Sequence, residues 1–261
     1  MSIITLTSDL GEGSHYSAIV KGAILRLLPS AKLVDVTHAI ARYDIMHAAY
    51  VVGRSFRAFP VGTVHMVAVD PEQTDLQAEA VAVACEGHYF VGPNNGVISL
   101  ICDHLPVICH KISLESVILE DYPRSFRAAR IFAAATAFLA SGGDLSILGE
   151  ASSLKDTRWG DPSYSNNCLR GKIIYIDHFG NAITNICKEE FLGLKQDRRF
   201  EIFIRNVRLR RIVSTYSDVS KADALAIFGE SSKLEIAIRE ASAEELLGLK
   251  LHDMITIEFS Q

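Results

Sequence analysis

The sequence has no long apolar run and no paired cysteines, and both absences restrict what the chain can be. No apolar segment reaches the ~18 residues that a membrane-spanning helix needs; the longest candidate, residues 131–140, is short and rich in alanine. The five cysteines are scattered, odd in number and without a CxxC pair, which favours reduced thiols over a disulfide framework or a zinc site. No basic region followed by an apolar stretch opens the sequence, so we expect no signal peptide and a cytoplasmic protein.

A basic surplus and the common phosphate-binding motifs are also missing. The formal net charge is −5 at pH 7, whereas a nucleic-acid binder needs basic surface to displace counterions. Gly11 and Gly13 resemble the start of a dinucleotide fingerprint, but Tyr16 stands where its third glycine belongs. Neither a GxxxxGK loop nor a GxSxG elbow occurs. The composition, 49% hydrophobic and 22% charged, indicates an ordinary globular protein without a nucleic-acid or membrane partner.

The first half of the sequence alternates strand-like and helix-like segments. Apolar residues at helical spacing predict helices over 16–28 and 44–56, the second capped by Asp44. Strands joined by helical crossovers pair in parallel. The predicted fold class is therefore α/β, with an N-terminal, mostly parallel sheet flanked by helices. Its first strands are expected at 3–7, 33–36 and 64–69, followed by a hairpin over 80–91, a strand over 107–112 and a helix over 125–139.

The second half has a different pattern. Residues 152–167 turn polar and are interpreted as a linker. From residue 168 the apolar period changes to two, which predicts a small all-β barrel. The expected domains are an α/β domain at 1–151 and a β-barrel domain at 168–261. Candidate strands of the second domain are 172–177, 200–204, 209–215, 225–228, 234–238 and 254–259, with brief helices at 188–194 and 243–247.

Polar residues follow the first three predicted strands. Asp9 comes after the first, His38 after the second and Asp70 after the third. Ligands of open parallel sheets bind beyond the carboxyl ends of the strands, and a carboxylate such as Asp9 can accept hydrogen bonds from both hydroxyls of a ribose. The alternative is structural, because aspartates after strands commonly cap helices or form turns. Because three polar residues follow strands whose ends meet at one edge of the sheet, a binding site is favoured.

A second dense group of polar residues lies in the predicted barrel, within residues 176–185. There a strand enters a turn that holds Asp177, Phe179, Gly180 and Asn181. Carboxylate, amide and aromatic groups can hold an amino acid or a purine by hydrogen bonds and stacking. A hairpin stabilised by asparagine and glycine explains the same residues equally well.

Together these runs resemble the S-adenosylmethionine hydroxide adenosyltransferase family, which includes fluorinating and chlorinating enzymes. The likeness extends over nearly the whole chain, and its most specific parts are the proline-asparagine loop and the Asp-His-Phe-Gly-Asn run. It is carried by Ser8-Asp9-Leu10-Gly11 with Lys21-Gly22, Val34-Asp35-Val36-Thr37-His38, Val69-Asp70-Pro71, Gly92-Pro93-Asn94-Asn95-Gly96, residues 176–185 and Leu234-Glu235-Ile236-Ala237.

The resemblance implies a fold, an assembly and a reaction. It implies a seven-stranded sheet domain followed by a β-barrel, and a homotrimer with each site between one subunit's first domain and its neighbour's second domain. The implied substrate is S-adenosylmethionine, a nucleoside-type small molecule, with no cofactor and no metal. Water attacks the ribose 5′ carbon, giving adenosine and methionine.

Substrate-binding residues also follow from the resemblance. Asp9 would hold the ribose diol, and Asp177 and Asn181 would bind the methionine end and the adenine edge. Phe179 would pack on the ligand. The other candidates are Tyr43 and Tyr216, which match ligand-facing aromatics, together with Asn95, Phe126 and Ser231.

The residues that would activate the water depart from the family pattern. Hydroxide-type members surround it with Asp, Arg and His; Asp70 matches the Asp, but Gln77 stands at the Arg position and Arg127 at the His position. A glutamine carries no charge to lower a water pKa, and an arginine, with a pKa above ~12, cannot act as a base near neutral pH. In one interpretation Arg127 supplies the missing cation, and Asp70 orients or deprotonates the water.

Two alternatives stay open. The hydroxide machinery is lost and the protein only binds adenosyl ligands, or the chain uses another nucleophile such as chloride. Fluoride is disfavoured because Ala128, near the halide-binding position, leaves only a backbone donor to offset its desolvation.

Overall fold

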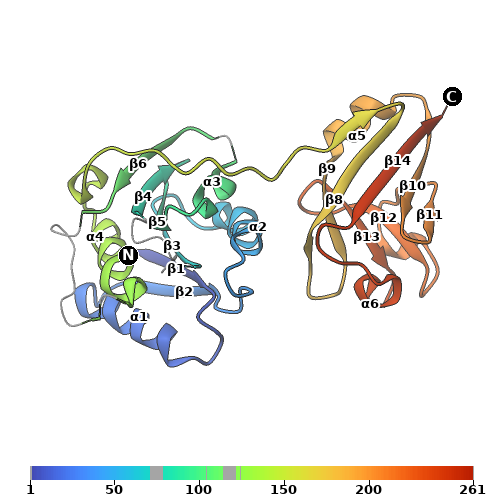
Figure 1. Cartoon of the computed structure of the whole chain (residues 1–261). Helices are drawn as coiled ribbons and strands as arrows, with labels where there is room; N and C mark the ends of the chain where they lie inside the picture. Colours follow the sequence, from blue (N-terminus) through green and yellow to red (C-terminus); the bar gives the residue numbers. More distant parts are fainter. Residues whose placement is uncertain (1, 71–78, 104, 114–121, 124, 261) are drawn as a thin grey trace. The chain divides into compact units, whose positions relative to one another are not determined.

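The chain folds into two compact units, residues 1–158 and 159–261, in a computed structural model that describes all residues except 1, 71–78, 104, 114–121, 124 and 261 (Figure 1). The boundary falls inside the predicted linker, 152–167, which also holds a short strand, β7 (Ser163–Ser165). The first unit alternates strands and helices and the second consists mainly of strands, so the predicted fold class is confirmed. None of the described helices combines the length and apolar character that crossing a bilayer requires.

Six described strands form the sheet of the first unit, in the order β2-β1-β3-β5-β4-β6. Strands β2, β1, β3 and β5 are parallel, as the crossover pattern predicts, whereas β4 is antiparallel to both of its neighbours. In place of the seventh strand that the resemblance implies, the described residues form a single bridge between His110 and Ala151 at the β6 edge. The strands are β1 (Ile3–Ser8), β2 (Lys32–Thr37), β3 (Val64–Ala68), β4 (Ala80–Cys85), β5 (His88–Pro93) and β6 (Val107–Lys111).

Two capped helices connect the parallel strands. Helix α1 (His15–Leu27) follows β1 and is capped by the Ser14 side chain; α2 (Ile45–Ser55) follows β2 and is capped by Asp44, which accepts a 2.9 Å hydrogen bond from the backbone N–H of His47. Because each helix begins just beyond the carboxyl end of a strand, the loops before α1 and α2 lie at the same edge of the sheet. Helix α3 (Val97–Cys102) follows β5 at this edge as well.

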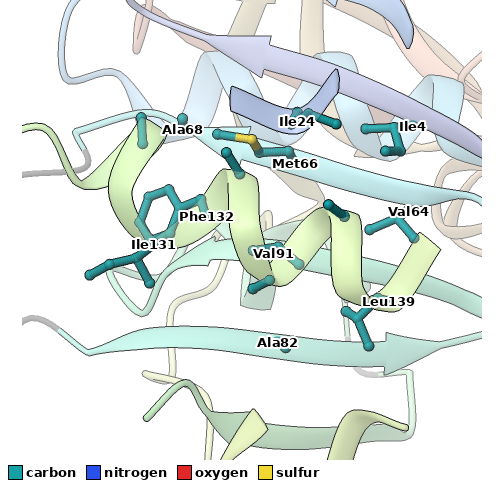
Figure 2. Packing of buried hydrophobic residues seen from close by; sticks show 14 of the residues in the cluster. Ile4, Ile24, Val64, Met66, Ala68, Ala82, Val91, Ile131, Phe132 and Leu139 are labelled. Carbon is teal, nitrogen blue, oxygen red and sulfur yellow. The ribbon is translucent and has the colours of Figure 1, made fainter. Parts of the chain in front are cut away.

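The predicted helix over 125–139 differs from the observed one in its first turns. A π-helix, η2 (Ala128–Phe132), runs directly into α4 (Ala133–Ala140). Apolar spacing does not distinguish the two kinds of turn, because both place the same alanines against the sheet. Figure 2 shows this helix lying across the strands, and Phe132 and Met66 belong to the same buried cluster. Phe132 is fully buried, and burying such a side chain contributes ~1.5–3 kcal/mol.

Two histidines are buried on the other face of this sheet. His65 lies among the rings of Phe56, Phe59 and Phe90. Its Nδ1 is 2.7 Å from Thr5 Oγ1, and its Nε2 is 3.2 Å from Nδ1 of His88. Burial, with a smaller contribution from His88, lowers the pKa of His65 to about 3. The folded protein therefore holds this imidazole neutral.

We expect this buried histidine to make the first unit acid-sensitive. Because the unfolded chain binds the proton at about pH 6.5 and the folded chain only near pH 3, this stability is complete above pH 6.5 and is lost as the pH falls. Between pH 7 and pH 5 the loss amounts to about 2 kcal/mol. Hydrogen exchange of the β3 amides at several pH values measures it. His65→Gln is expected to flatten this pH dependence, whereas His178→Gln, at an exposed position, leaves it as it is; equal dependence in both variants would contradict the assignment.

The second unit is a nearly closed antiparallel barrel. Its strands follow the order β11-β10-β14-β8-β9-β13-β12, with β7 paired to β8. The terminal strands β11 and β12 contact each other. The elements are β8 (Cys168–Ile176), β9 (Ala182–Cys187), α5 (Lys188–Lys195), β10 (Arg199–Ile204), β11 (Val207–Leu209), β12 (Ala224–Phe228), β13 (Lys233–Ile238), α6 (Ala243–Leu247) and β14 (Met254–Ser260).

The predicted strand over 209–215 is wrong. Strand β11 ends at Leu209, and the strand-type pairing of the segment after it is an isolated bridge between Val213 and Ile227. Arginine alternates with apolar residues only from Val207 to Arg210, and alternation reports which side chains face the core and not whether a partner strand is available. The segment instead leads to a 3₁₀ turn, η4 (Tyr216–Asp218).

Candidate functional site

Asp9 follows β1 directly, and its carboxylate joins three loops of the first unit. Oδ2 accepts hydrogen bonds from the backbone N–H of Tyr43 at 3.0 Å and of Asp70 at 3.2 Å. Tyr43 belongs to the loop before α2, and Asp70 follows β3. Among the described residues, no hydrogen bond to Oδ1 is formed. The structure thus brings together Asp9, Tyr43 and Asp70, and it leaves one carboxylate oxygen for a ligand.

Both residues that donate to Asp9 have left-handed backbone conformations. The φ angle is +64° at Tyr43 and +48° at Asp70. Such conformations are uncommon outside glycine and cost of order 1–3 kcal/mol when the surroundings impose them. Tyr43 also leaves 72% of its surface exposed. A strained loop that presents an exposed aromatic ring beside a carboxylate is typical of ligand-binding sites.

Asn95 lies in the tight loop between β5 and α3 and is 2% exposed. Its Nδ2 donates to the carbonyl of Val69 at 3.0 Å, and its Oδ1 accepts from the N–H of Val97 at 3.1 Å. The amide therefore ties the end of β3 to the start of α3, next to Asp70. Its contact with substrate stays a prediction, whereas this structural bridge is observed. Gly92, near the end of β5, is required sterically, since a Cβ there would lie 2.4 Å from the Val67 carbonyl oxygen.

Phe126 and Arg127 lie at the start of η2, which packs on β3 and β5. The Phe126 ring packs edge-on against Tyr16, with centroids 5.5 Å apart. The Arg127 guanidinium carbon is 5.8 Å from the centroid of the Phe132 ring, a cation–π arrangement. Both residues therefore directly precede a turn that packs on β3, the strand before Asp70. Gln77, the third predicted activating residue, lies outside the described residues.

The cysteines and acidic residues form no metal centre in the described part of the chain. No group of three or more His, Cys, Asp or Glu side chains there is arranged to hold an ion. The five cysteines are free, and three of them are buried.

In the second unit, Asp177 organises the turn between β8 and β9. Its Oδ1 accepts from the N–H groups of Phe179 and Asn181, both at 2.9 Å, and its Oδ2 accepts from Asn181 Nδ2 at 3.0 Å. Gly180 has a φ of +79°, and a Cβ there would collide with the Ser242 side chain. The hairpin stabilised by asparagine and glycine, which is the structural alternative for this segment, is therefore present. It holds the Phe179 ring out from the unit, with 74% of the residue exposed.

A pocket of about 740 Å³ lies beside this turn. Its volume is in the range of sites for small organic ligands, about 300–1,000 Å³. Asp177, Phe179, Asn181 and Tyr216 share its lining, so four of the predicted residues of the barrel come together. Ser231 lies elsewhere, in the turn between β12 and β13, where its Oγ accepts from the Lys233 N–H at 3.3 Å. The other lining residues are Ser217, Ile238, Arg239, Glu240, Ala241 and Ser242.

Tyr216 is held against the pocket wall by a buried carboxylate. Its hydroxyl donates to Glu235 Oε1 at 2.5 Å. Burial raises the pKa of Tyr216, and the Glu235 carboxylate raises it further. Burial also raises the pKa of Glu235. The phenol therefore keeps its proton and its fixed orientation in the neutral pH range.

The sequence did not identify Glu235, which bonds to Tyr216, or several residues that line the pocket. Glu235 enters the sequence analysis only within the Leu234-Glu235-Ile236-Ala237 run, although a single carboxylate in an otherwise apolar strand is itself a signal of a specific partner. Arg239 and Ser242 carry no comparable signal, because they follow β13 in a segment that reads as an ordinary polar turn.

The fold and its two clusters define a class of protein that binds small molecules with polar and aromatic parts. One unit has carboxylates at the ends of parallel strands, and the other has a pocket lined by two exposed aromatic rings. Residues 4–149 match the SAM hydroxide adenosyltransferase N-terminal domain, and residues 171–256 match the C-terminal domain of the same family. The chain belongs to the S-adenosylmethionine hydroxide adenosyltransferase family.

Several curated relatives align with nearly the whole chain. A protein of Methanocaldococcus jannaschii named (R)-S-adenosyl-L-methionine hydrolase is 28% identical, covering 98% of this chain and 96% of its own. Its namesake from Thermus thermophilus is 29% identical, covering 96% of this chain and 97% of its own. A third hydrolase of this name, from Salinispora tropica, is 26% identical over 97% of both chains.

Solved structures show the same fold. The crystal structure of an uncharacterized conserved protein from Thermotoga maritima has a TM-score of 0.87 at 28% identity, covering 97% of this chain and 99% of its own. A conserved hypothetical protein from Thermus thermophilus gives a TM-score of 0.76 at 27% identity, over the full length of both chains.

Proposed function

We propose that this chain is an S-adenosylmethionine hydrolase that transfers the adenosyl group to water. The observation that supports it most directly is the Asp9 carboxylate, which bonds to Tyr43 and Asp70 in the loops after β2 and β3 and keeps one oxygen for a ribose hydroxyl. Family membership supplies the reaction class. The names of the relatives add the (R) configuration at the sulfonium sulfur, which we propose for this substrate as well.

The reaction is an in-line displacement at the ribose 5′ carbon. The water oxygen forms a bond to that carbon as the carbon–sulfur bond breaks, and the electron pair leaves with sulfur as the neutral thioether of methionine. The water loses one proton, which Asp70 accepts before it passes to solvent. Because a sulfonium leaves without protonation, no general acid is required. Holding water and substrate in line can contribute ~7–11 kcal/mol.

The activating groups differ from the family pattern, so their roles are proposed for this chain specifically. Asp70 orients and deprotonates the water, and Arg127 supplies the positive charge that Gln77 lacks. The left-handed backbone at Asp70 and its N–H bond to Asp9 fix this residue relative to the ribose carboxylate. Arg127 lies at the start of η2, which packs on β3.

Substrate binding divides between the two units. We propose that Asp9 and Tyr43 hold the ribose, whereas Asp177, Asn181, Phe179 and Tyr216 hold the purine and the methionine end. Asn95, Phe126 and Ser231 complete the set by family likeness. Neither unit by itself carries both clusters. We therefore propose a homotrimer in the cytoplasm, with each site completed by the second unit of a neighbouring subunit.

A direct assay tests the activity. Purified protein is incubated with each sulfonium epimer of S-adenosylmethionine, and adenosine and methionine are separated by chromatography. In heavy-oxygen water, the new oxygen is expected at the adenosine 5′ position, with faster turnover of the (R) epimer. Intact binding without either product at high protein concentration would refute hydrolysis.

A non-catalytic binder is the second candidate, favoured by the arginine at position 127 in place of a histidine base. In that case calorimetry shows tight adenosyl binding without turnover, and the double variant Gln77→Arg with Arg127→His gains activity. A double variant that stays inert counts against this candidate. Adding chloride to the same assay tests the third option, since chloride attack gives a 5′-chloro nucleoside.

A further inference from the structure

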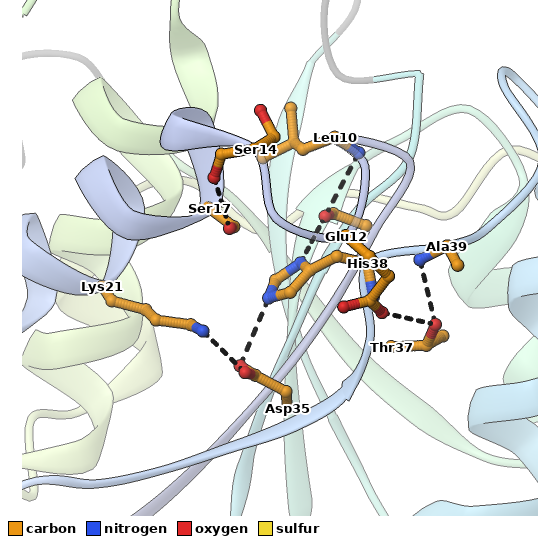
Figure 3. A network of polar contacts seen from close by, with 10 residues as sticks. Leu10, Glu12, Ser14, Ser17, Lys21, Asp35, Thr37, His38 and Ala39 are labelled. Carbon is orange, nitrogen blue, oxygen red and sulfur yellow. Dashed lines mark hydrogen bonds and ion pairs between the residues drawn. The ribbon is translucent and has the colours of Figure 1, made fainter.

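A buried histidine, His38, is hydrogen-bonded to Ser8, the residue directly before Asp9. The His38 side chain, at the end of β2, is held at both ring nitrogens: Nδ1 is 2.7 Å from Ser8 Oγ, and Nε2 is 3.2 Å from Asp35 Oδ1 (Figure 3). Lys21 Nζ donates to the other oxygen of Asp35 at 2.6 Å. These four residues, Lys21, Asp35, His38 and Ser8, form one continuous chain, here called the His38 chain. It ends at the residue directly before Asp9.

The partners fix the direction of each hydrogen bond in the His38 chain. A carboxylate can only accept, so His38 Nε2 carries the hydrogen that faces Asp35. In the neutral ring Nδ1 then accepts, and the Ser8 hydroxyl donates to it. The Ser8 oxygen in turn accepts from the N–H of Leu10 at 3.3 Å. The chain therefore reaches the backbone on both sides of Asp9.

Backbone contacts of the same histidine tie down the rest of this loop. The His38 carbonyl accepts from the N–H of Gly11 at 2.9 Å, and the Ser8 carbonyl accepts from the N–H of Ile40 at 3.3 Å. The N–H of His38 donates to Glu12 Oε1 at 2.9 Å. The backbone on both sides of Asp9 is thus bonded to residues 38–40. The Asp9 carboxylate is bonded to Tyr43 and Asp70.

The order Ser-His-Asp also occurs in nucleophilic triads, but burial excludes that role here. Ser8 is 2% exposed and His38 is 4% exposed. A nucleophile must reach the substrate, and this hydroxyl faces the interior of the loop. The more accessible residue beside it is Asp9, which is half-buried.

We propose that His38 is a positioning residue for Asp9: through Ser8 it sets the loop that aims the free carboxylate oxygen at the ribose diol. The inference rests on the proposed function, in which Asp9 binds ribose. A carboxylate displaced by about 1 Å loses the geometry of a charge-assisted hydrogen bond. The loss is therefore confined to ligands that carry the hydroxyls.

Two substitutions test the contacts of the two ring nitrogens of His38 separately. His38→Asn places an amide at the Nδ1 position and can keep the Ser8 contact, whereas His38→Gln reaches the Nε2 position and gives up Ser8. The measurement is the dissociation constant of the full-length protein for adenosine and for 2′,3′-dideoxyadenosine, by calorimetry. The ratio of the two constants reports the diol contact alone. Thermal melting checks that each variant is folded.

We expect His38→Gln to reduce the preference for adenosine by about tenfold, with dideoxyadenosine binding within about twofold of the original, and His38→Asn to keep most of the preference. Equal weakening of both nucleosides in His38→Gln, or no change in either, would overturn the positioning role. If the original protein shows no preference for the diol, or Asp9→Asn leaves that preference intact, then the ribose assignment of Asp9 is wrong and the inference fails with it. Loss of hydrolysis alone, with the diol preference and its dependence on His38 present, contradicts only the proposed reaction.

Discussion

Asp70→Asn is expected to lower kcat by about 10²- to 10⁴-fold, because it removes the base that takes the water proton. The KM for S-adenosylmethionine is expected to change little, since the side chain acts on water and its backbone N–H to Asp9 remains. Asparagine tolerates the left-handed conformation of φ +48° at least as well as aspartate. Steady-state kinetics with the (R) epimer, together with a melting curve, measure both quantities.

Asp103→Asn is the matched control for this variant. Asp103 also has a left-handed backbone, with φ +38°, and directly follows α3 at an exposed position. The control is expected to keep full activity. If Asp70→Asn kept full activity as well, the base would have to be another group; if it lost binding and not turnover, Asp70 would belong to substrate recognition.

Mixing two inactive variants is expected to restore activity. Asp9→Ala removes the ribose carboxylate of the first unit, and Asp177→Ala removes the carboxylate that organises the turn of the second unit. Each alone is expected to be inactive. In a trimer whose sites are shared between neighbours, random mixing of equal amounts makes about a quarter of the sites intact, because one neighbour supplies Asp9 and the other Asp177.

The measurement is hydrolysis after the two variants are unfolded together and refolded, or co-expressed. Each variant refolded alone is the control, and sedimentation gives the subunit count. About a quarter of the original activity supports shared sites. A mixture as inactive as its components contradicts them, provided that the melting curves show both variants folded.

Much of the first unit could be predicted from local pattern. The crossovers between β1, β2 and β3 require parallel strands, and parallel strands place the residues after them at one edge. Asp9, His38 and Asp70 were therefore expected together, and the structure joins Asp9 directly to Asp70. Tyr43 was found only through family likeness, because nothing in the local sequence indicates that its amide donates to Asp9.

Other elements depend on neighbouring segments of the fold that cannot be identified from the sequence. The π-helical turn of η2 and the end of β11 at Leu209 both escaped prediction. Side-chain period reports which residues face the core, and it is nearly the same whether a turn is α or π and whether or not a neighbouring strand is present. The π-helical turn of η2 is decided by its packing against β3 and β5. The end of β11 is decided by the sheet edge that is available to it.

By itself, the sequence determined the fold class of each unit and the places where polar residues interrupt it, since period, caps and turn residues act within a few positions of the chain. The tertiary structure decided what those residues do. In the folded chain His38 is hydrogen-bonded to Ser8 and Asp35. Asn95 donates to the Val69 carbonyl, and Tyr216 donates to Glu235. Each of these contacts joins residues 19 or more positions apart, except that between His38 and Asp35. The direction of such side chains depends on a burial and a hydrogen-bonding partner that exist only once the strands are assembled.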